Sequence, residues 1–282
     1  MRICLLTPAP DHPLLAATTA LLAPRHQVET LDPRHAVLPS PARVPQALAD
    51  VYLLKSRTPC ALAFARYLEQ HGAPVLNSAD ATELCQDRTA MAEAALAAGL
   101  PFAATTAATT PPRLAERGGV TYPLVVKSRH SRRHDLVARV DDAEQLRALA
   151  AQWPDEPVVT QTYTPNNGWD HKLWVIGDEV FAAVRRSELA PPSARRAEPV
   201  AAGELPPAWL DVVRRAGEVF ALDVYGVDLL DVPGGPLIVD VNAFPGIRGQ
   251  RGAPEALAAL SLRAASGDYR PRGTTRGVIL NG

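Results

Sequence analysis

The chain has few cysteines, almost no net charge and no long uninterrupted apolar run among its 282 residues. Its three cysteines, Cys4, Cys60 and Cys85, are odd in number and form no Cys-x-x-Cys pair, which favours a reducing, cytoplasmic compartment over a disulfide framework. The net charge of −1 excludes the global basic excess of a nucleic-acid binder. Charges interrupt the Ala/Leu-rich runs, and Pro8 and Pro10 end the first apolar run early, so we expect neither a membrane span nor a signal peptide.

Two glycine-rich signatures are missing as well. No Gly-x-Gly-x-x-Gly follows the first apolar run, where residues 7–11 read Thr-Pro-Ala-Pro-Asp, and this excludes a dinucleotide-binding oxidoreductase. The segment 128–135 also lacks glycine and instead carries three arginines and two histidines. It therefore departs from a glycine-rich phosphate loop, and a solvated basic turn is one interpretation of it.

What the chain does have is enough apolar sequence, 47%, for one large domain or two to three smaller ones. Residues 1–85 alternate short apolar runs with helical patterns, which predicts an N-terminal open α/β domain. The pattern then changes, and residues 86–165 and 166–267 predict two α+β units. Residues 268–282 have little to bury and predict a disordered tail.

Apolar periodicity and turn residues define the expected elements. The expected strands cover residues 3–6, 51–54, 75–76, 122–127, 136–140, 157–163, 171–176, 180–186, 226–230 and 237–242. The expected helices cover residues 61–71, 80–98, 142–151, 208–221 and 254–265. The stretch 190–207 is expected to be a loop without a readable pattern.

The most informative stretch is the pair of apolar runs near the C-terminus, joined by the turn 233–236. Alternation along the second run places Asp240 and Asn242 on one face, and Asp228 lies on the first run, close enough to join them. Carboxylate and amide oxygens with no neighbouring Cys or His favour Mg²⁺, or Mn²⁺, over zinc. The alternative is an ordinary hairpin with solvated acidic side chains.

This three-part layout, with the hairpin at the end of the third part, resembles the ATP-grasp superfamily over nearly the whole chain. Two branches are most similar, the RimK-type carboxylate–amine ligases and the inositol trisphosphate 5/6-kinases. The resemblance implies an ATP-grasp fold of α/β and α+β parts, in which an N-terminal open α/β (pre-ATP-grasp) domain precedes two α+β subdomains. It implies that Mg²⁺ and ATP lie between the two subdomains and that the N-terminal domain helps to hold the acceptor.

Several positions match residues that contact the nucleotide in this superfamily. Lys127 ends an apolar run and matches a strand-end lysine on the ATP phosphates, a catalytic candidate whose ammonium neutralises charge. Arg88 stands in an Asp-Arg pair typical of the inositol kinases, where ligases usually have Asp-Lys. Gln161, Thr162 and Tyr163 end a strand that resembles the adenine-binding hinge. The alternatives are a solvated lysine and an ordinary core strand.

Two further strands carry matching basic residues. Lys172 shares its strand face with Trp174, opposite Leu173, so it is expected to point into the nucleotide cleft. An edge-strand lysine that favours solubility is the alternative. Arg185 and Arg186 end the next strand and match an arginine before a variable loop, with Arg186 the closer counterpart and a candidate for catalysis and substrate binding.

The acceptor side is implied by resemblance and by position. His134 resembles a histidine near the phosphoryl acceptor of the inositol kinases and is the third catalytic candidate. Lys55 and Arg57 follow a strand of the N-terminal domain, where an open α/β sheet binds ligands, and Lys55 also matches an inositol-kinase lysine. They are expected to join other cations in a cleft that favours an acidic acceptor. The other members of this expected cleft are Arg129, Arg132, Arg133, Lys172 and Arg186.

The resemblance implies in-line transfer of the γ-phosphoryl group of ATP to an acceptor oxygen. We favour a RimK-like ligase, in which a carboxylate becomes an acyl phosphate and then an amide, because many bacterial ATP-grasp ligases share the Asp-Val-Asn-x-x-Pro-Gly hairpin. A kinase of the inositol-phosphate type is the alternative, and a non-catalytic ATP-binding module is a remote third. The expected partner is a small acidic amino acid, peptide or phosphorylated polyol, with no nucleic acid or membrane; the oligomeric state is open, with a homodimer as one option.

Overall fold

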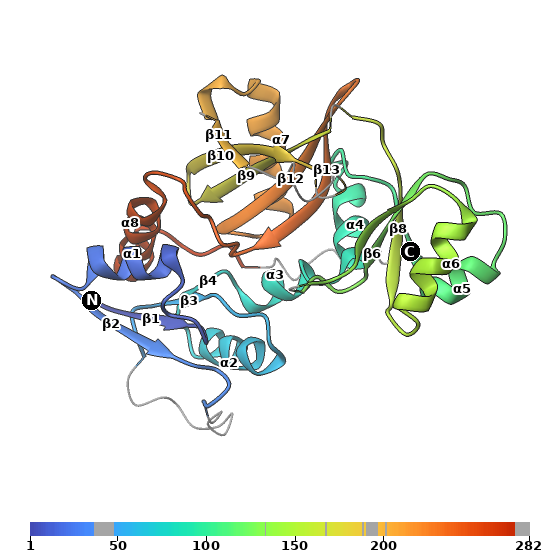
Figure 1. Ribbon diagram of the computed structural model, residues 1–282. Coiled ribbons are helices and arrows are strands. Elements are labelled where there is room, and N and C mark those ends of the chain that lie inside the picture. The colour runs from blue at the N-terminus through green and yellow to red at the C-terminus, as the bar shows by residue number, and fades with distance from the viewer. Residues whose placement is uncertain are drawn as a thin grey trace.

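The computed structural model describes residues 1–36, 48–132, 134–166, 168–187, 189, 197–200 and 202–273. Within these residues the chain forms three β-sheets with helices packed on them (Figure 1). The sheets use strands from residues 2–76, 105–162 and 169–243, in that order along the chain. This order follows that of the three expected units, whose boundaries stay predictions.

The N-terminal unit is an open α/β sheet with the strand order β2-β1-β3-β4, in which every pairing is parallel. Its elements are β1 (Arg2–Leu6), α1 (Pro13–Leu22), β2 (Gln27–Leu31), β3 (Val51–Leu54), α2 (Pro59–Gln70) and β4 (Val75–Leu76). The central strands β1 and β3 are almost fully buried, as their unbroken apolar runs predict. Helix α2 begins where the Thr58 hydroxyl accepts a hydrogen bond from the backbone N–H of Ala61.

The single helix expected over residues 80–98 is wrong, because the chain forms two helices there. They are α3 (Ala79–Leu84) and α4 (Arg88–Ala97). The Asp87 carboxylate caps α4 by accepting a hydrogen bond from the backbone N–H of Thr89 at 2.9 Å. The backbone N–H of Arg88 donates to the carbonyl of Arg129 at 2.9 Å, outside any helix. The break therefore places Arg88 at the start of its own helix and against the second sheet.

The second sheet is antiparallel, with the strand order β5-β8-β6-β7. Its strands and helices are β5 (Thr105–Ala108), α5 (Pro111–Glu116), β6 (Leu124–Ser128), β7 (Val137–Val140), α6 (Ala143–Gln152) and β8 (Val158–Thr162). The sequence predicts neither β5 nor α5. Leu114 of α5 and Leu146 of α6 pack with Val126 and Val158, so both helices cover one face and leave the other for a cleft.

The third sheet is also antiparallel, with the strand order β11-β10-β9-β12-β13. Its elements are β9 (Trp169–Ile176), β10 (Glu179–Arg186), β11 (Ala197–Val200), the 3₁₀ turn η2 (Ala202–Glu204), α7 (Pro207–Val219), β12 (Val224–Val232) and β13 (Gly235–Ala243). Strand β11 and turn η2 fall in the stretch 190–207, where the sequence gives no pattern. Residues 190–196 and 201 of that stretch lie outside the described residues.

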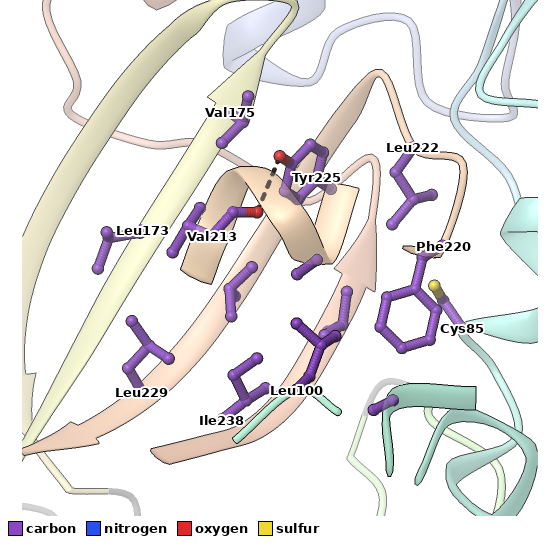
Figure 2. Close-up of a cluster of buried hydrophobic side chains, with 14 of the residues drawn as sticks. Cys85, Leu100, Leu173, Val175, Val213, Phe220, Leu222, Tyr225, Leu229 and Ile238 are labelled. Atoms are coloured by element: carbon purple, nitrogen blue, oxygen red, sulfur yellow. Dashed lines mark hydrogen bonds between the residues drawn. The ribbon is translucent and has the colours of Figure 1, made fainter. Parts of the chain in front are cut away.

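The two faces of the third sheet differ in character because side chains alternate along each strand. Val227 and Leu229 of β12 are fully buried and pack with Leu173 of β9 in one core, which also includes residues of α4 and α7. Figure 2 shows this core, in which the Tyr225 hydroxyl donates a hydrogen bond to the carbonyl of Val213 at 3.1 Å. The intervening residues of β12 and β9 face the other way, toward the second sheet.

The last helix, α8 (Ala253–Ser266), returns to the N-terminal unit and packs beside α1 (Figure 1). Its Leu257 and Leu260 share a core with Ile3 and Leu5 of β1. After this helix the Tyr269 hydroxyl donates to the carboxylate of Asp223 at 2.6 Å, and residues 268–273 are described. The rest of the expected disordered tail, 274–282, lies outside the described residues.

The helix lengths and the cysteines can be compared with the sequence expectations. Across the described segments, no helix has both the length and the apolar character that crossing a membrane would take. Cys4 and Cys85 are buried, Cys60 is exposed, and all three are free thiols. Burial raises the pKa of Cys4, to about 12, which fits an inert core thiol.

Candidate active site

A cleft of about 410 Å³ opens between the second and third sheets. Val125 and Lys127 of β6 line one wall, and strands β9, β12 and β13 supply the other. Arg57 of the N-terminal unit and Pro245, just after β13, close one end. Side chains of all three units therefore line one cavity.

The floor of the cleft is a regular grid of side chains, because three adjacent strands are in register. Asp228 of β12 lies directly opposite Asp240 of β13 and opposite Lys172 of β9. One step along the same face, Gly226 lies opposite Asn242 and Trp174. The two carboxylates and the amide predicted to hold a metal thus come together on one face and line the cleft.

A β-bulge separates Asp228 from Leu229, since Leu229 pairs with Ile238 and Asp228 pairs with Asp240. The extra residue is Val239, and its carbonyl accepts a hydrogen bond from Lys127 Nζ at 2.9 Å. Lys127 is only 6% exposed and lines the cleft from the opposite wall. The predicted catalytic lysine therefore reaches across to the strand that carries Asp240.

Lys172 and Asp228 form the closest ion pair of the floor. Lys172 Nζ donates to Oδ1 of Asp228 at 2.7 Å and to Oδ2 at 2.6 Å. Lys172 and Trp174 line the cleft while Leu173 is fully buried on the other face, as strand alternation predicts. Lys172 is thus an inward-facing lysine and not an edge-strand solubility residue.

Arg88 links the two walls. Its NH1 donates to the carbonyl of Ser128 at 2.8 Å and to Oδ2 of Asp135 at 2.7 Å, and its NH2 donates to Oδ2 of Asp240 at 3.0 Å. Burial alone would lower the pKa of the Arg88 guanidinium, but Asp240 and Asp135 more than offset this and raise it. Arg88 therefore keeps its charge inside the protein.

The carboxyl group of Asp240 also stays ionised. Burial alone would raise its pKa, but the charges of Arg88 and Lys127, together with that of Lys172, lower it below the usual value. A buried carboxylate held in its charged form, surrounded by cations, is the environment that a divalent metal and a polyphosphate can share.

The predicted adenine hinge lies at the far end of the cleft. Gln161, Thr162 and Tyr163 all line it, together with Val125 and Val137. The Gln161 side chain is 4% exposed and donates from Nε2 to the Thr105 hydroxyl at 3.0 Å. The Tyr163 ring lies under the Arg139 guanidinium, 4.0 Å from its centroid. A cleft with apolar walls and a few polar groups in fixed positions suits a flat nucleobase.

Six cationic side chains among the described residues line the cleft against four carboxylates. The cations are Arg57, Arg88, Lys127, Arg132, Lys172 and Arg185. The carboxylates are Asp135, Asp170, Asp228 and Asp240. The cavity therefore carries a local positive excess in a chain that is nearly neutral overall, and it favours an anionic ligand.

Two residues of the cleft lacked a clear sequence signal. Arg185 of β10 lines the cavity, with its NH2 4.0 Å from Oδ2 of Asp170, whereas the family resemblance favours Arg186. Strand alternation along β10 could have separated the two, since neighbouring residues face opposite sides. Asp135 ends the basic segment 128–135, and no local pattern predicts that it pairs with Arg88.

Four predicted site residues do not line the cleft. Arg186 stacks on the Trp169 ring at 4.3 Å, and His134 is exposed on a turn with a positive φ of 59°. Arg129 forms a two-point ion pair with Asp87, from NH2 at 2.6 Å and Nε at 3.0 Å. The other is Lys55, which donates to backbone carbonyls. Arg133 lies outside the described residues.

The donor set fits a hard divalent cation. Within the described part of the chain, no three His, Cys, Asp or Glu side chains form a group that could hold a metal ion. The predicted set differs because its third member is the amide of Asn242. Two carboxylates and an amide on one sheet face, with no sulfur or imidazole among them, are oxygen ligands of the kind that Mg²⁺ prefers.

Comparison with known proteins bears on the fold and the family. A family model described as a RimK-like ATP-grasp domain matches residues 105–259, which include the hairpin and both walls of the cleft. The probable alpha-L-glutamate ligase 1 of Shewanella amazonensis is 40% identical over 91 residues, covering 31% of this chain and 30% of that protein. The matched segments span about a third of the length of the curated relatives.

Solved structures resemble the whole chain. A RimK domain ATP-grasp protein from Sphaerobacter thermophilus superposes with a TM-score of 0.71 at 24% identity, covering 93% of this chain and 100% of that one. The ATP-grasp ligase PsnB, solved with a minimal precursor, Mg and ADP, has a TM-score of 0.68 at 17% identity, covering 94% of this chain and 98% of that one. These likenesses confirm the predicted ATP-grasp fold.

Proposed function

The chain belongs to the RimK-like ATP-grasp family, and we propose that it is an ATP-dependent ligase that joins an acidic carboxylate to an amine. One observation carries this proposal. Asp228, Asp240 and Asn242 share one face of a cationic cleft with Lys127 on the opposite wall and Arg57 at one end. Such a cleft suits a polyphosphate, a divalent cation and a carboxylate side by side.

The nucleotide would lie with its base between the apolar residues near Gln161 and Tyr163 and its phosphates toward Lys127 and Arg88. Lys127 offers a compact ammonium that can follow charge as it moves between phosphate oxygens. Arg88 contributes a fixed charge, because its NH1 and NH2 are held by Asp135 and Asp240. Among the described residues its Nε is buried without a hydrogen-bond partner.

Asp228, Asp240 and Asn242 would hold Mg²⁺. Bound there, the ion would neutralise phosphate charge and polarise the phosphoryl group. Lys172, which now donates to both oxygens of Asp228, would be free to move its ammonium toward phosphate once that carboxylate has another cation. These residues supply the positive charge that the transfer needs at the phosphate oxygens.

The acceptor would enter at the end of the cleft bounded by Arg57 and Arg132. Arg57 NH1 lies 3.4 Å from the Ser131 hydroxyl, and Arg132 is held by both carboxylate oxygens of Glu156 at 2.6 Å. Guanidinium groups bind carboxylates in two-point fashion, which favours an acidic amino acid or peptide. The name of the Shewanella relative, a probable alpha-L-glutamate ligase, supports the same class.

The reaction balances in two steps. A carboxylate oxygen of the acceptor takes the γ-phosphoryl group, and the bond between that group and ADP breaks, so an acyl phosphate and ADP form. An amine nitrogen then attacks the acyl carbon, the bond from that carbon to the phosphate oxygen breaks, and phosphate leaves. The nitrogen loses a proton and an amide remains. Arg57 would hold the acidic acceptor during both steps.

The geometry of the cleft supports the kinase alternative less well than the ligase. His134, its acceptor-side candidate, is exposed and does not line the cleft. The Asp-Arg pair still resembles that branch, but here Arg88 is held by Asp135 and Asp240. Retention of Lys127 and all three metal ligands argues against a non-catalytic module. A cytoplasmic location and a homodimer stay predictions.

The experiment is a product screen. The purified protein, MgCl₂ and ATP are incubated with acidic amino acids or short acidic peptides, with and without a second amine, and in parallel with inositol phosphates. We expect ADP and free phosphate in equal amounts only when carboxylate and amine are both present. ADP together with a phosphorylated polyol and no free phosphate would support the kinase instead.

A further inference from the structure

Lys55 reaches from the N-terminal unit to the turn that follows β13. Its Nζ donates to the carbonyl of Phe244 at 2.9 Å and to that of Pro245 at 3.1 Å. The same ammonium lies 5.2 Å from the centroid of the Phe244 ring. Its own backbone is fixed at the end of β3, because its N–H donates to the carbonyl of Leu6 at 3.1 Å. A rigid strand end in one unit thus holds a turn in another.

The turn needs such a partner. Phe244 has a φ of +43°, a conformation that non-glycine residues adopt only when their surroundings enforce it. Its backbone N–H is fixed by the carbonyl of Val224 at 2.8 Å, and its ring is 5% exposed in the core of the N-terminal unit. Two successive carbonyl oxygens then point at one place, where they repel each other unless a cation lies between them.

The position of the turn matters to the cleft because the turn begins at Phe244, two residues after Asn242. Pro245 and Gly246 line the cavity. A Cβ atom placed on Gly226, the residue opposite Asn242, would lie only 3.2 Å from Pro245 Cγ. The ring of Pro245 therefore packs directly beside the row that carries Asn242, and a shift of the turn would move both.

Lys55 itself is not a wall of the cavity. It does not line the cleft, and in the described part of the chain its ammonium is held by carbonyl oxygens rather than by a carboxylate. Burial and the charges of Arg57 and Arg248 lower the pKa of Lys55 to about 8, so its surroundings do not attract a cation by themselves. The hydrogen bonds to the carbonyl oxygens of Phe244 and Pro245 explain where the Lys55 ammonium lies.

The small number of lysines in the chain also supports a specific role for Lys55. The chain has 29 basic residues, of which only Lys55, Lys127 and Lys172 are lysines. Lys127 and Lys172 both line the cleft. All other Lys or Arg positions of the chain are arginines, and Lys55 is the third lysine. Its compact ammonium can donate to two adjacent carbonyl oxygens, whereas a guanidinium is planar and differently shaped.

We propose that Lys55 is a positioning residue for the metal site: its ammonium fixes the turn at Phe244 and Pro245 and so sets the place of Asn242 on the cleft floor. This inference rests on the proposed function. It reassigns Lys55, which sequence resemblance placed among the substrate contacts. Partners that orient metal ligands typically change metal affinity when they are removed, by about 10- to 100-fold.

The test measures metal binding directly. Mn²⁺ is titrated into the full chain without nucleotide, and the Mn²⁺ that stays free is measured by electron paramagnetic resonance for the wild type, Lys55→Ala and Asp240→Asn. We expect Lys55→Ala to weaken Mn²⁺ binding at least about tenfold. Ethylammonium or propylammonium should restore binding to this variant, whereas tetramethylammonium, which has no N–H, should not. Arg25→Met, at an exposed arginine of the same unit, serves as the matched control.

Three outcomes separate the possibilities. Wild-type Mn²⁺ affinity in Lys55→Ala, beside a large loss in Asp240→Asn, would overturn the role of Lys55 and leave the metal site standing. Unchanged affinity in Asp240→Asn would overturn the metal site and with it the proposed function. A raised acceptor KM with normal Mn²⁺ binding would make Lys55 a substrate contact and also overturn the inference. If Lys55→Ala does not fold, Lys55→Met retains the apolar stem and takes its place in the direct comparison.

Discussion

Lys172 and Asp228 face each other across adjacent strands, and the lysine ammonium donates to both oxygens of the carboxylate, at 2.7 and 2.6 Å. The proposed metal would use those same oxygens. Without a metal the ammonium neutralises a carboxylate that is only 18% exposed, and with one the two cations compete. The Asp228 carboxylate can therefore pair either with Lys172 or with the proposed metal ion.

The first prediction follows from that competition. Lys172→Met should bind Mn²⁺ more tightly than the wild type in the absence of nucleotide, because Asp228 loses its resident cation. The same variant should bind ATP about tenfold more weakly, the loss expected for one hydrogen bond to a charged group. Calorimetric titration measures both. Weaker Mn²⁺ binding without nucleotide would mean that Lys172 supports the metal site and does not compete for it.

The second prediction concerns Asp240. Asp240→Asn should abolish Mg²⁺-dependent turnover, because it removes a metal charge next to Lys127 and Arg88. It should also lower the free energy of unfolding by roughly 3 kcal/mol, since Arg88 would be left as a buried charge with one carboxylate fewer. Denaturant unfolding and ADP release measure the two effects.

Asp231→Asn is the matched control for Asp240→Asn, because Asp231 lies on the same hairpin, is exposed and does not line the cleft. It should keep both stability and turnover. Mg²⁺-dependent activity retained in Asp240→Asn would remove the metal from this floor.

The third prediction separates two neighbouring arginines. Arg185 lines the cleft, whereas Arg186 stacks on Trp169 outside it. Arg185→Met should lower kcat/KM at least about tenfold through loss of a charge that faces the ligand. Arg186→Met should leave kcat/KM near the wild-type value. The reverse ranking in steady-state kinetics would restore the role that sequence resemblance gave to Arg186.

The fourth prediction is a pH effect on stability. Burial raises the pKa of Asp223 to about 6, although its bonds from Tyr269 and Arg272 oppose the shift. The folded state then binds a proton that the unfolded state, with a pKa of 3.8, has already released. Asp223 therefore adds up to about 3 kcal/mol to the free energy of unfolding. This contribution is fully present below pH 3.8 and is lost as the pH rises toward 6.

Denaturant unfolding of Asp223→Asn between pH 4 and pH 7 checks this shift. The variant should gain stability relative to the wild type as pH rises. Asp211→Asn, an exposed position on α7, should show no such trend. A difference between Asp223→Asn and the wild type that does not change with pH would mean that Asp223 is ionised throughout.

Local sequence patterns predicted the parts of the fold that depend on short-range physics. The apolar runs of β1 and β3 and the alternation of β12 and β13 each predict a strand, and the hairpin brings Asp228 and Asp240 together because antiparallel pairing follows from the turn. The inward direction of Lys172 follows from the same alternation. Most of the proposed metal floor was therefore readable from the sequence.

The features that the sequence did not predict depend on contacts between residues that are far apart in the chain. Asp87 lies inside a pattern that reads as one helix, but its carboxylate caps α4 and binds Arg129, 42 residues away. Strand β5 has no apolar run, and it forms because β8 pairs with it. Arg88 and Asp135 are brought together only by the folded second unit. No local pattern carries such pairings.

In the proposed reaction a carboxylate oxygen takes the γ-phosphoryl group of ATP on the way to an amide. An acidic acceptor found in the product screen is labelled with ¹⁸O in the reacting carboxylate and turned over with Mg²⁺, ATP and an amine. The released phosphate should carry one ¹⁸O atom, because the bond from the acyl carbon to that oxygen breaks. Phosphate without the label, with amide formed at the same rate, would contradict it.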